Sequence, residues 1–298
     1  MLRAIVLGAG AGGGFPQWNS AGEGCRRARA GDPAARPRTQ AGLAVSADGE
    51  RWVLVNASPD LRQQIAATPA LHPRPRPLRN SPIAAVILTG AEVDAIAGLL
   101  HLRERHAFDI YAAAATLAVL AANPIFRALD PQLVPRRPLP LDQAFDLCGI
   151  RVQAYPVPGK IPLFAEEDGQ DPGLTEGEEA LGLALSAGGG VLHYIPGCAM
   201  MTEALAARLD GADVLLFDGT LFTDEEMLRL GAGPKTGRRM GHMSMRESMA
   251  ALAPLRIGRR IFTHINNTNP ALLADSPERA ELAAAGWEVA EDGMEILL

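Results

Sequence analysis

Cysteine, aromatic residues and long apolar runs are all scarce in this 298-residue chain. The three cysteines (Cys25, Cys148 and Cys198) lie far apart and include no Cys-x-x-Cys pair, so a disulfide framework is not expected. No apolar stretch approaches the roughly 20 residues that span a bilayer, which excludes membrane insertion. Aromatic residues make up 5% of the chain, so its core must consist mainly of aliphatic side chains.

Basic residues are also fewer than acidic ones. The formal net charge is −6 and the isoelectric point is near 5.6, whereas a nucleic-acid-binding surface would be basic. The apolar run at the N-terminus is too short for a signal peptide and continues directly into glycines, so we interpret it as a first strand. We therefore expect a soluble cytoplasmic protein, and a homodimer is compatible with the sequence.

Strand-like apolar runs and helical patterns follow one another along most of the chain. The predicted strands are Arg3–Leu7, Trp52–Val55, Ala84–Leu88, Arg151–Tyr155, Gly182–Ser186, Val191–Ile195, Val214–Phe217, Arg260–His264 and Met294–Leu297. The predicted helices are Asp60–Ala67, Glu92–His106, Ala113–Ala122, Thr202–Asp210, Met245–Leu252 and Pro277–Ala285. Early strands are joined tightly and later ones alternate with helices, which favours an α/β protein with mixed sheets. Since no domain boundary is evident, residues 1–298 are predicted to form one domain.

Three segments are predicted to be loops. Thr68–Pro82 contains five prolines, which are incompatible with a regular helix or a central strand. Lys160–Ala180 is acidic and rich in glycine, and Gly231–Met243 is rich in glycine and basic residues. Long loops in a compact domain commonly carry function.

The glycines at 8–13 satisfy the pattern G-x-G-x-x-G after a predicted strand. A dinucleotide site also requires that a helix begin there and that an acidic residue end a second strand about 20 residues later. The glycines instead run into FPQWN, and the stretch near position 30 does not resemble a strand. We therefore expect a turn in which the backbone passes close to a neighbouring segment or a ligand.

Four residues of metal-binding type stand at predicted strand ends or in adjoining loops. Alone, Asp94 would be interpreted as a first-turn carboxylate favoured by the helix dipole. However, Asp218 and His264 also end strands, and His242 precedes a helix for which Ser244 is the predicted N-cap. Because the carboxyl ends of strands in α/β proteins are where sites assemble, these side chains can surround one metal ion. The other histidines (His72, His101, His106 and His193) are expected to be structural or exposed.

Two imidazoles with one or two carboxylates and open coordination positions suit non-haem Fe(II). Structural zinc prefers closed sites of cysteine and histidine, although catalytic Zn²⁺ fits the same ligands. Mg²⁺ and Mn²⁺ are less suited to two imidazoles.

Residues 84–104 resemble the junction at which metallo-β-lactamase-fold hydrolases carry a strand followed by T-H-x-H-x-D-H-x-x-G-L. The residues that match this pattern are Thr89, Asp94, Gly98 and Leu99. The three histidine positions hold Gly90, Glu92 and Ala95. The resemblance implies an αββα sandwich of two mixed sheets flanked by helices, without the dinuclear zinc site of the hydrolases.

Nearly the whole chain resembles the pyrroloquinoline quinone (PQQ) biosynthesis protein B family. The motifs that carry this resemblance are GAGAGGGFPQWN, VNASPDLRQQI, LTGAEVDAIAGLLHLRE, YIPGCA, LFDGT, MGHMSM and THINNTNP. It implies a cytoplasmic step in the synthesis of PQQ from a cross-linked Glu-Tyr excised from a small peptide. Members of the family have been described as iron-dependent hydroxylases of the tyrosine ring and as carriers of the quinone or its precursor to the periplasm.

The chain departs from the family at two places. The family usually carries W-N-C-x-C-x-x-C after the glycines, three thiolates for a structural zinc, but here these positions are Ser20, Gly22 and Cys25. That zinc is therefore not expected. Ala95 also replaces the histidine that usually follows the aspartate, which leaves Asp94, His242 and His264 as first-choice ligands.

Three functions follow as hypotheses. In the first, Asp94, His242 and His264 hold Fe(II), Asp218 completes the site or orients a ligand, and the protein hydroxylates a tyrosine ring. Lys235, Arg238 and Arg239 would then pair with substrate carboxylates, unless they form only a solvated loop. The second is a non-catalytic carrier of PQQ or its precursor. The third, hydrolysis of an ester or phosphodiester, is disfavoured because two metals normally activate the water in such enzymes.

Overall fold

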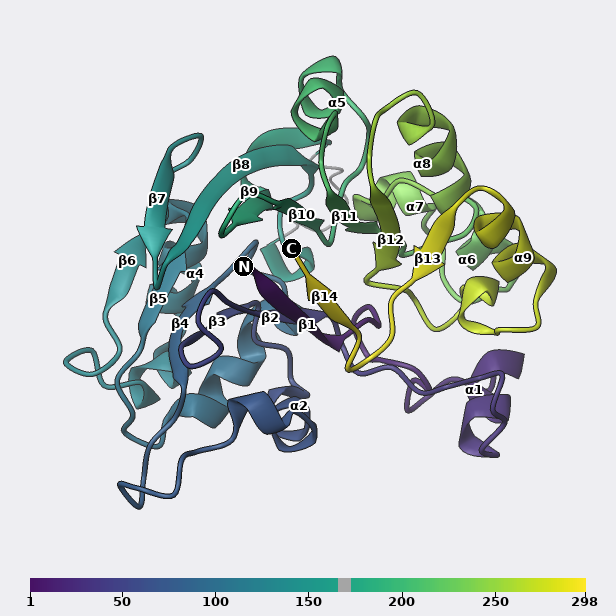
Figure 1. The fold of residues 1–298 in the computed structure, drawn as a ribbon. Coiled ribbons are helices and arrows are strands. Elements are labelled where there is room, and N and C mark those ends of the chain that lie inside the picture. The colour runs from purple at the N-terminus through teal and green to yellow at the C-terminus, as the bar shows by residue number, and fades with distance from the viewer. Residues whose placement is uncertain (166–172) are drawn as a thin grey trace.

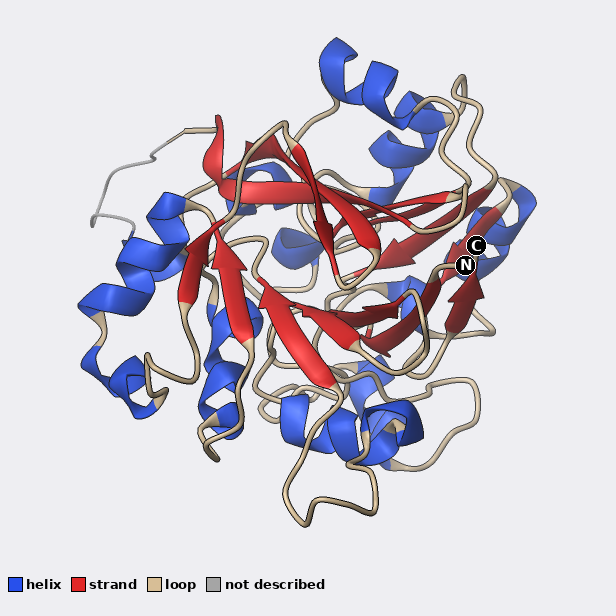
Figure 2. Cartoon of the chain, turned by 60° about the vertical axis from the view of Figure 1, so that its left-hand side comes forward, coloured by secondary structure: helices blue, strands red, loops and turns tan. Residues whose placement is uncertain are grey.

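The computed structural model describes residues 1–165 and 173–298, which form two facing seven-stranded sheets with helices outside them (Figures 1 and 2). The first sheet has the spatial order β14 (Glu295–Leu297), β1 (Arg3–Gly8), β2 (Gly42–Ser46), β3 (Trp52–Val55), β4 (Ile83–Ile87), β5 (Asp109–Ala112) and β6 (Arg136–Pro138). The second has the order β13 (Trp287–Val289), β12 (Arg259–Thr263), β11 (Val214–Asp218), β10 (Val191–Ile195), β9 (Thr175–Ser186), β8 (Ile150–Gly159) and β7 (Ala144–Leu147). Both sheets combine parallel and antiparallel pairs, so the predicted αββα fold is confirmed.

Strand alternation sorts the aliphatic side chains into layers. In β2, Leu43 and Val45 face the second sheet, while Ala44 faces the helices on the outside. The outer face of the first sheet packs against α2 (Leu61–Ala67), α3 (Val93–Ile96), η2 (Ala97–Leu102) and α4 (Ala114–Ala122). The outer face of the second sheet packs against α1 (Glu23–Arg29), α5 (Glu203–Leu209), α8 (Met245–Leu252) and α9 (Pro277–Ala284). The shorter elements are α6 (Glu226–Arg229), α7 (Gly237–Met240), η1 (Pro69–Leu71), η3 (Pro124–Ala128), η4 (Leu163–Ala165) and η5 (Pro270–Leu272).

The predicted helix Glu92–His106 is wrong in length. The α-helix ends at Ile96 and continues as the 3-10 helix η2, because the backbone pairs with a neighbouring segment instead of extending the helix. The Ala57 N–H donates to the Ala95 carbonyl at 2.7 Å, and the Gly98 N–H donates to the Ala57 carbonyl at 2.8 Å. A Cβ at Gly98 would lie 2.0 Å from the Ser58 carbonyl oxygen, so this contact requires glycine.

Two of the predicted loops contain regular structure. Within Lys160–Ala180, β9 already begins at Thr175 because this stretch pairs with the end of β8, while residues 166–172 lie outside the described part. Within Gly231–Met243, the Thr236 side chain caps the short helix α7. Thr68–Pro82 has only the short turn of η1 and is otherwise irregular, as predicted. Among the described residues, no helix has the length and apolar character needed to cross a bilayer.

Candidate metal centre

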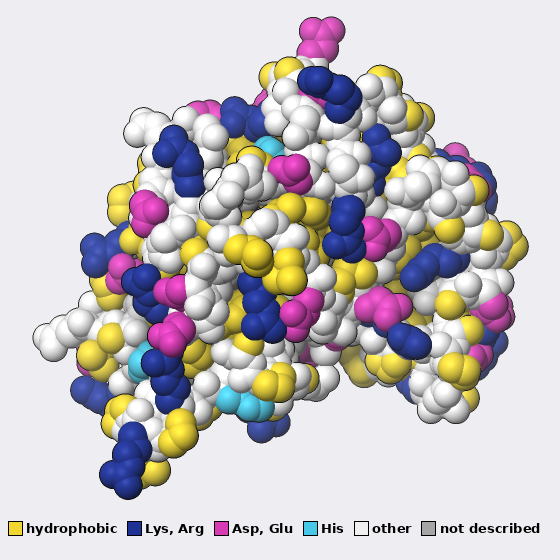
Figure 3. Space-filling view, in the orientation of Figure 1, with side chains coloured by type: hydrophobic (Ala, Val, Ile, Leu, Met, Phe, Trp, Pro, Cys, Tyr) yellow, Lys and Arg dark blue, Asp and Glu magenta, His cyan; other side chains and the backbone are white. Residues whose placement is uncertain are grey.

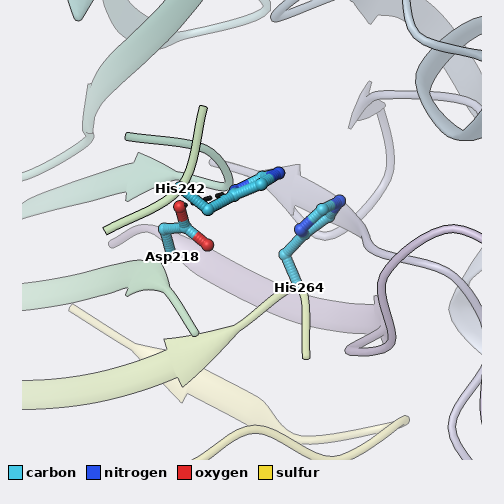
Figure 4. Close-up of side chains that lie close together, drawn as sticks. All are labelled: Asp218, His242 and His264. Atoms are coloured by element: carbon cyan, nitrogen blue, oxygen red, sulfur yellow. Dashed lines mark hydrogen bonds and ion pairs between the residues drawn. The ribbon is translucent and has the colours of Figure 1, made fainter. Parts of the chain in front are cut away.

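The four predicted metal-site residues converge at one edge of the sandwich. Asp94 lies in the first turn of α3, and Asp218 ends β11. His264 directly follows β12, and His242 lies two residues after the end of α7. Asp218, His242 and His264 each offer a ligand atom within 4.8 Å of the other two. Figure 4 shows both imidazoles extending to the same side, away from Asp218. Asp94 joins them through its Oδ2, which lies 3.0 Å from His264 Nε2.

Parallel strand pairing places Asp218 and His264 together. Asp218 is in register with Thr263, so both strands deliver their polar residues at the same sheet edge. His264 has a left-handed backbone (φ 55°), which is unfavourable for a residue with a side chain. The glycine-rich turn after β1 holds it there: Ile265 N donates to the Ala9 carbonyl at 2.8 Å, and Ala11 N donates to the Ile265 carbonyl at 2.9 Å.

The glycine-rich turn passes close to its neighbours, as predicted. A Cβ at Gly8 would lie 2.3 Å from the Gln40 carbonyl oxygen, and one at Gly12 would lie 3.6 Å from Asp94 Oδ2. The next helix, α1, begins only at Glu23, so the strand–turn–helix unit of a dinucleotide site does not form here.

Asp218 is completely buried, and the protein uses all of its acceptor positions. Its Oδ1 accepts hydrogen bonds from Thr220 N at 3.0 Å and Thr220 Oγ1 at 2.7 Å. Its Oδ2 accepts from Cys198 N at 2.9 Å and from His242 Nδ1 at 2.8 Å. A carboxylate has about four lone-pair sites, so this arrangement suits Asp218 better to orient His242 than to bind a metal itself. With Nδ1 protonated towards Asp218, His242 presents Nε2 to the site.

Thr220 orients the His264 imidazole in the same way as Asp218 orients that of His242. Its hydroxyl has one proton, which goes to the carboxylate of Asp218, and its oxygen accepts a hydrogen bond from His264 Nδ1 at 2.9 Å. The lone pair on His264 Nε2 then faces Asp94 Oδ2 at 3.0 Å. Two acceptor atoms at this distance require a proton or a metal ion between them. Two cis ligands that are each about 2.1 Å from one metal are about 3 Å apart, so the geometry fits a shared ion.

The pKa values have the directions expected for this arrangement. Burial by itself would raise the pKa of Asp94, but the hydrogen bond and positive charge of His264, with the charge of His242, leave it below its ordinary value. Burial would lower the pKa of His264, but Asp94 raises it above the ordinary value. Burial would raise the pKa of Asp218, and His242 holds it low. The site therefore favours ionised carboxylates and attracts positive charge.

The structure leaves no room for a side chain at Gly90. Gly90 stands where hydrolases of this fold carry their first histidine, and a Cβ there would lie 2.9 Å from the Glu179 carbonyl oxygen in β9. The Leu181 N–H donates to the Thr89 carbonyl at 2.9 Å and fixes β9 over this segment. The backbone therefore covers the space from which a first histidine would extend.

The predicted basic residues lie in α7 or just before it, in the segment that leads to His242. The Arg238 guanidinium pairs with Glu247 at 3.1 Å, and its backbone N–H donates to Asp224 Oδ1 at 2.7 Å, so it supports the start of α8. Arg239 lies in α7, and its carbonyl accepts a hydrogen bond from Lys160 Nζ at 3.0 Å. Lys235 lies between α6 and α7. Substrate contacts by these residues stay a prediction.

Sequence reasoning missed Thr220 and Lys160. Thr220 lies two residues after Asp218 and donates its N–H back to the carboxylate, a turn that Asp favours and that the run DGT could have indicated. Lys160 directly follows β8, and its side chain packs on Gly241 beside His242. His193 was correctly expected to be structural: it is buried, and its Nδ1 lies 2.7 Å from the Tyr155 hydroxyl.

The residues at the family's structural zinc position do not fit a zinc ion. Cys25 is buried with Sγ 3.6 Å from Asn267 Oδ1, and the Ser20 hydroxyl accepts a hydrogen bond from Gly22 N. Arginines hold this segment instead: Arg29 donates to the carbonyls of Gln17 and Ser20. A single thiolate cannot build the closed tetrahedral site that structural zinc requires.

Comparisons with known proteins identify the family. Residues 51–265 match the model of the beta-lactamase superfamily domain. The chain is 56% identical to coenzyme PQQ synthesis protein B of Gluconacetobacter diazotrophicus, with 99% of each covered, and 54% identical to that of Xanthomonas euvesicatoria pv. vesicatoria, with 100% of each covered.

Among solved structures, it resembles Zn²⁺-bound PqqB from Methylobacterium extorquens, with a TM-score of 0.95, 50% identity, and 99% and 100% of the two chains covered. A diphosphatase of the PhnP family, with a TM-score of 0.70, 21% identity, and 100% and 98% of the two chains covered, shares the fold. The chain therefore belongs to the coenzyme PQQ synthesis protein B family, within the metallo-β-lactamase fold.

Proposed function

We propose that this protein acts in the biosynthesis of PQQ in the cytoplasm as an Fe(II)-dependent oxygenase that hydroxylates the tyrosine ring of a Glu-Tyr precursor. Its family membership supports the pathway. The observation that supports the chemistry is the pair of imidazoles of His242 and His264, which offer ligand atoms within 4.8 Å of each other, with Asp94 Oδ2 3.0 Å from His264 Nε2. Two histidines and one carboxylate with open positions form the ligand set of many non-haem iron oxygenases.

The chain's own residues give each ligand its direction. Asp218 and Thr220 keep the protons of His242 and His264 on Nδ1, so that both Nε2 atoms serve as ligands. Fe(II) bound there would supply the activation of O₂. One oxygen atom enters the ring as a hydroxyl group and the other leaves as water, which consumes two electrons and two protons from an external reductant. Zn²⁺ fits the same ligands but has no redox chemistry.

The test is a single turnover under ¹⁸O₂ with anaerobically purified, Fe(II)-loaded protein, a cross-linked Glu-Tyr substrate and a chemical reductant. The expected product is heavier by at least one ¹⁸O, and the label should disappear in His264→Ala and Asp94→Ala. His101→Ala is the matched control, because it removes an exposed imidazole whose Nε2 lies 3.2 Å from the Pro59 carbonyl oxygen.

A carrier of PQQ or its precursor would give a different result. It would bind its ligand equally well with and without a chelator, and no ¹⁸O would enter the product. Iron that binds stoichiometrically without any labelled product would therefore contradict the oxygenase and favour the carrier.

A further inference from the structure

A second concave site lies away from the four converging residues. It is a cavity of about 200 Å³ between the segment that follows α1, the 3-10 helix η5, α9 and the residues after β13. Figure 1 draws α1 and α9 on the same side of the molecule. The polar lining consists of Arg36, Arg38, Arg279 and Glu291, with Pro33 and Leu272 among the apolar contacts.

Arg38 is a rigid, buried part of this cavity. Only 4% of the residue is exposed, and its guanidinium donates to the carbonyls of Ala290, Arg36 and Pro37 at 3.1, 2.9 and 3.0 Å. It also donates to Glu291 Oε1 at 2.8 Å. A buried guanidinium fixed by four hydrogen bonds cannot move away when a ligand enters, so its charge belongs permanently to the cavity wall.

Arg279 has fewer partners. Its guanidinium donates to the Ala271 carbonyl at 2.9 Å, and its nearest carboxylate oxygen, Glu291 Oε1, is 4.0 Å away, beyond hydrogen-bond distance. Its side chain is only 23% exposed. Burial and then the positive charge of Arg38 lower the pKa of Arg279, while the charge of Glu291 acts in the opposite direction. Within the part of the chain that the structure describes, the guanidinium group makes only the hydrogen bond to the Ala271 carbonyl, so most of its five N–H donors are available to a ligand.

The charges of the lining do not balance. Three arginines face one glutamate, since Glu291 pairs with Arg36 at 3.1 Å as well as with Arg38. The neighbouring Asp292, whose carboxylate accepts hydrogen bonds from Ala9 N and from the N–H and hydroxyl of Thr39, adds a second negative charge that acts on Arg38, which leaves the three arginines in excess by one. On the face of the molecule drawn in Figure 3, basic and acidic side chains are interspersed. A partly buried guanidinium whose nearest carboxylate oxygen is 4.0 Å away is only weakly compensated, and an anion in the cavity would offset part of its desolvation cost.

We propose that this cavity binds a small oxyanion, a phosphate or a carboxylate, with Arg279 as the main hydrogen-bond donor and Arg38 as the fixed charge. The planar fork of Arg279 suits bidentate contact with two oxygens of such a group. Glu291 competes with the anion for the same guanidinium groups. The binding of the anion does not depend on a metal or on the proposed oxygenase activity.

Isothermal titration calorimetry with inorganic phosphate, and separately with succinate, tests this at low ionic strength on the full chain. We expect saturable binding at one site for at least one of the two anions. Arg279→Gln should weaken binding by about tenfold or more, because it removes a charge-assisted contact. Arg36→Gln should weaken it less, since Arg36 is largely exposed.

Glu291→Gln provides the sharper test. It should tighten anion binding, because it removes the competing carboxylate, whereas a purely structural ion-pair cluster would lose stability and gain no affinity. Arg246→Gln is the matched control: Arg246 pairs with Glu281 on α9 outside the cavity, so its loss should leave the affinity unchanged. The absence of binding to the wild type, equal binding by Arg279→Gln, or weaker binding by Glu291→Gln would each overturn the proposal.

Discussion

The two sheets contribute unequally to the candidate metal centre. The second sheet supplies Asp218 and His264 from adjacent strand ends, and Thr220 links them by hydrogen bonds. The segment that follows β4 in the first sheet supplies Asp94, and at Gly90 in the same segment the backbone of β9 fills the space that a side chain would need. Within one fold, the residues from the second sheet can thus keep a metal-binding arrangement with its supporting hydrogen bonds. The corresponding position on the first sheet, Gly90, is instead packed against backbone. The difference favours one metal ion and redox chemistry over two-metal hydrolysis.

The largest expected effect comes from removing a ligand on either sheet. Asp94→Ala and His264→Ala should each lower iron affinity by at least about a hundredfold, because ligand loss exceeds the usual cost of losing a supporting hydrogen bond. Metal content after anaerobic gel filtration measures this effect. If Asp94→Ala keeps full iron content, the first sheet does not take part in the site.

The supporting hydrogen bonds should show the next largest effect. Thr220→Val removes the hydroxyl group that fixes His264, and it should lower iron affinity by about 10- to 100-fold. Thr220→Ser retains the hydroxyl and should stay close to the wild type. Competition with a coloured chelator gives these affinities; equal affinities for the Val and Ser variants would show that the hydroxyl does not matter.

The closed half of the site can be tested at Gly90. Gly90→His should not create a second metal site, because its Cβ would lie 2.9 Å from the Glu179 carbonyl oxygen. It should instead destabilise the fold by about 1–3 kcal/mol through overpacking. Metal analysis and thermal denaturation distinguish the outcomes, and a second bound metal ion without loss of stability would contradict the proposed closure.

Glu226, whose carboxyl group is buried near the part of the site that the second sheet builds, should make the stability of the folded protein depend on pH. Its carboxylate accepts hydrogen bonds from Phe222 N at 2.8 Å and from Thr268 Oγ1 at 2.6 Å, and so joins the segments that follow Asp218 and His264. Burial raises the pKa of Glu226 to about 7 from its ordinary 4.5. Because the folded protein then binds more protons than the unfolded chain between these pH values, stability should fall as pH rises through this range, by up to about 3 kcal/mol.

Chemical denaturation of wild type and Glu226→Gln between pH 4.5 and 8 measures this contribution. The variant should lack that part of the pH dependence, since its amide does not titrate. Parallel curves for the two proteins would show that Glu226 titrates normally.

The smallest effect is expected at Cys25. Cys25→Ser should leave the zinc content of the purified protein unchanged, because the residues around it do not form a zinc site. Elemental analysis checks this prediction, and loss of a bound zinc ion in the variant would contradict it.

Periodicity predicted the elements that bury one clear face. The bounds of β10 and α8 agree with the predicted ranges, because β10 is a short apolar run and α8 has an apolar face with a capping box at Ser244 and Glu247. Five strands were missed: β2, β5, β6, β7 and β13. Four of them have only three or four residues, and β2 lacks the alternation of apolar and polar residues because all five of its residues are buried. The length of α3 depends on backbone contacts with residues 57–58, which are distant in sequence and leave no local pattern.

The candidate site was partly predictable for the same reason. Asp94, Asp218, His242 and His264 could be identified because strand ends and residue types are visible in sequence. Which of the four binds a metal and which orients a ligand could not be predicted. These roles depend on hydrogen bonds from Thr220 and Cys198 to Asp218, which only the folded chain reveals.

X-ray absorption spectroscopy of the Fe(II)-loaded protein, combined with metal quantification, tests the central claim most directly. The account predicts one iron per chain, with scattering from two imidazoles that falls to one in His242→Ala. Two metal ions per chain, or an unchanged imidazole signal in that variant, would contradict it.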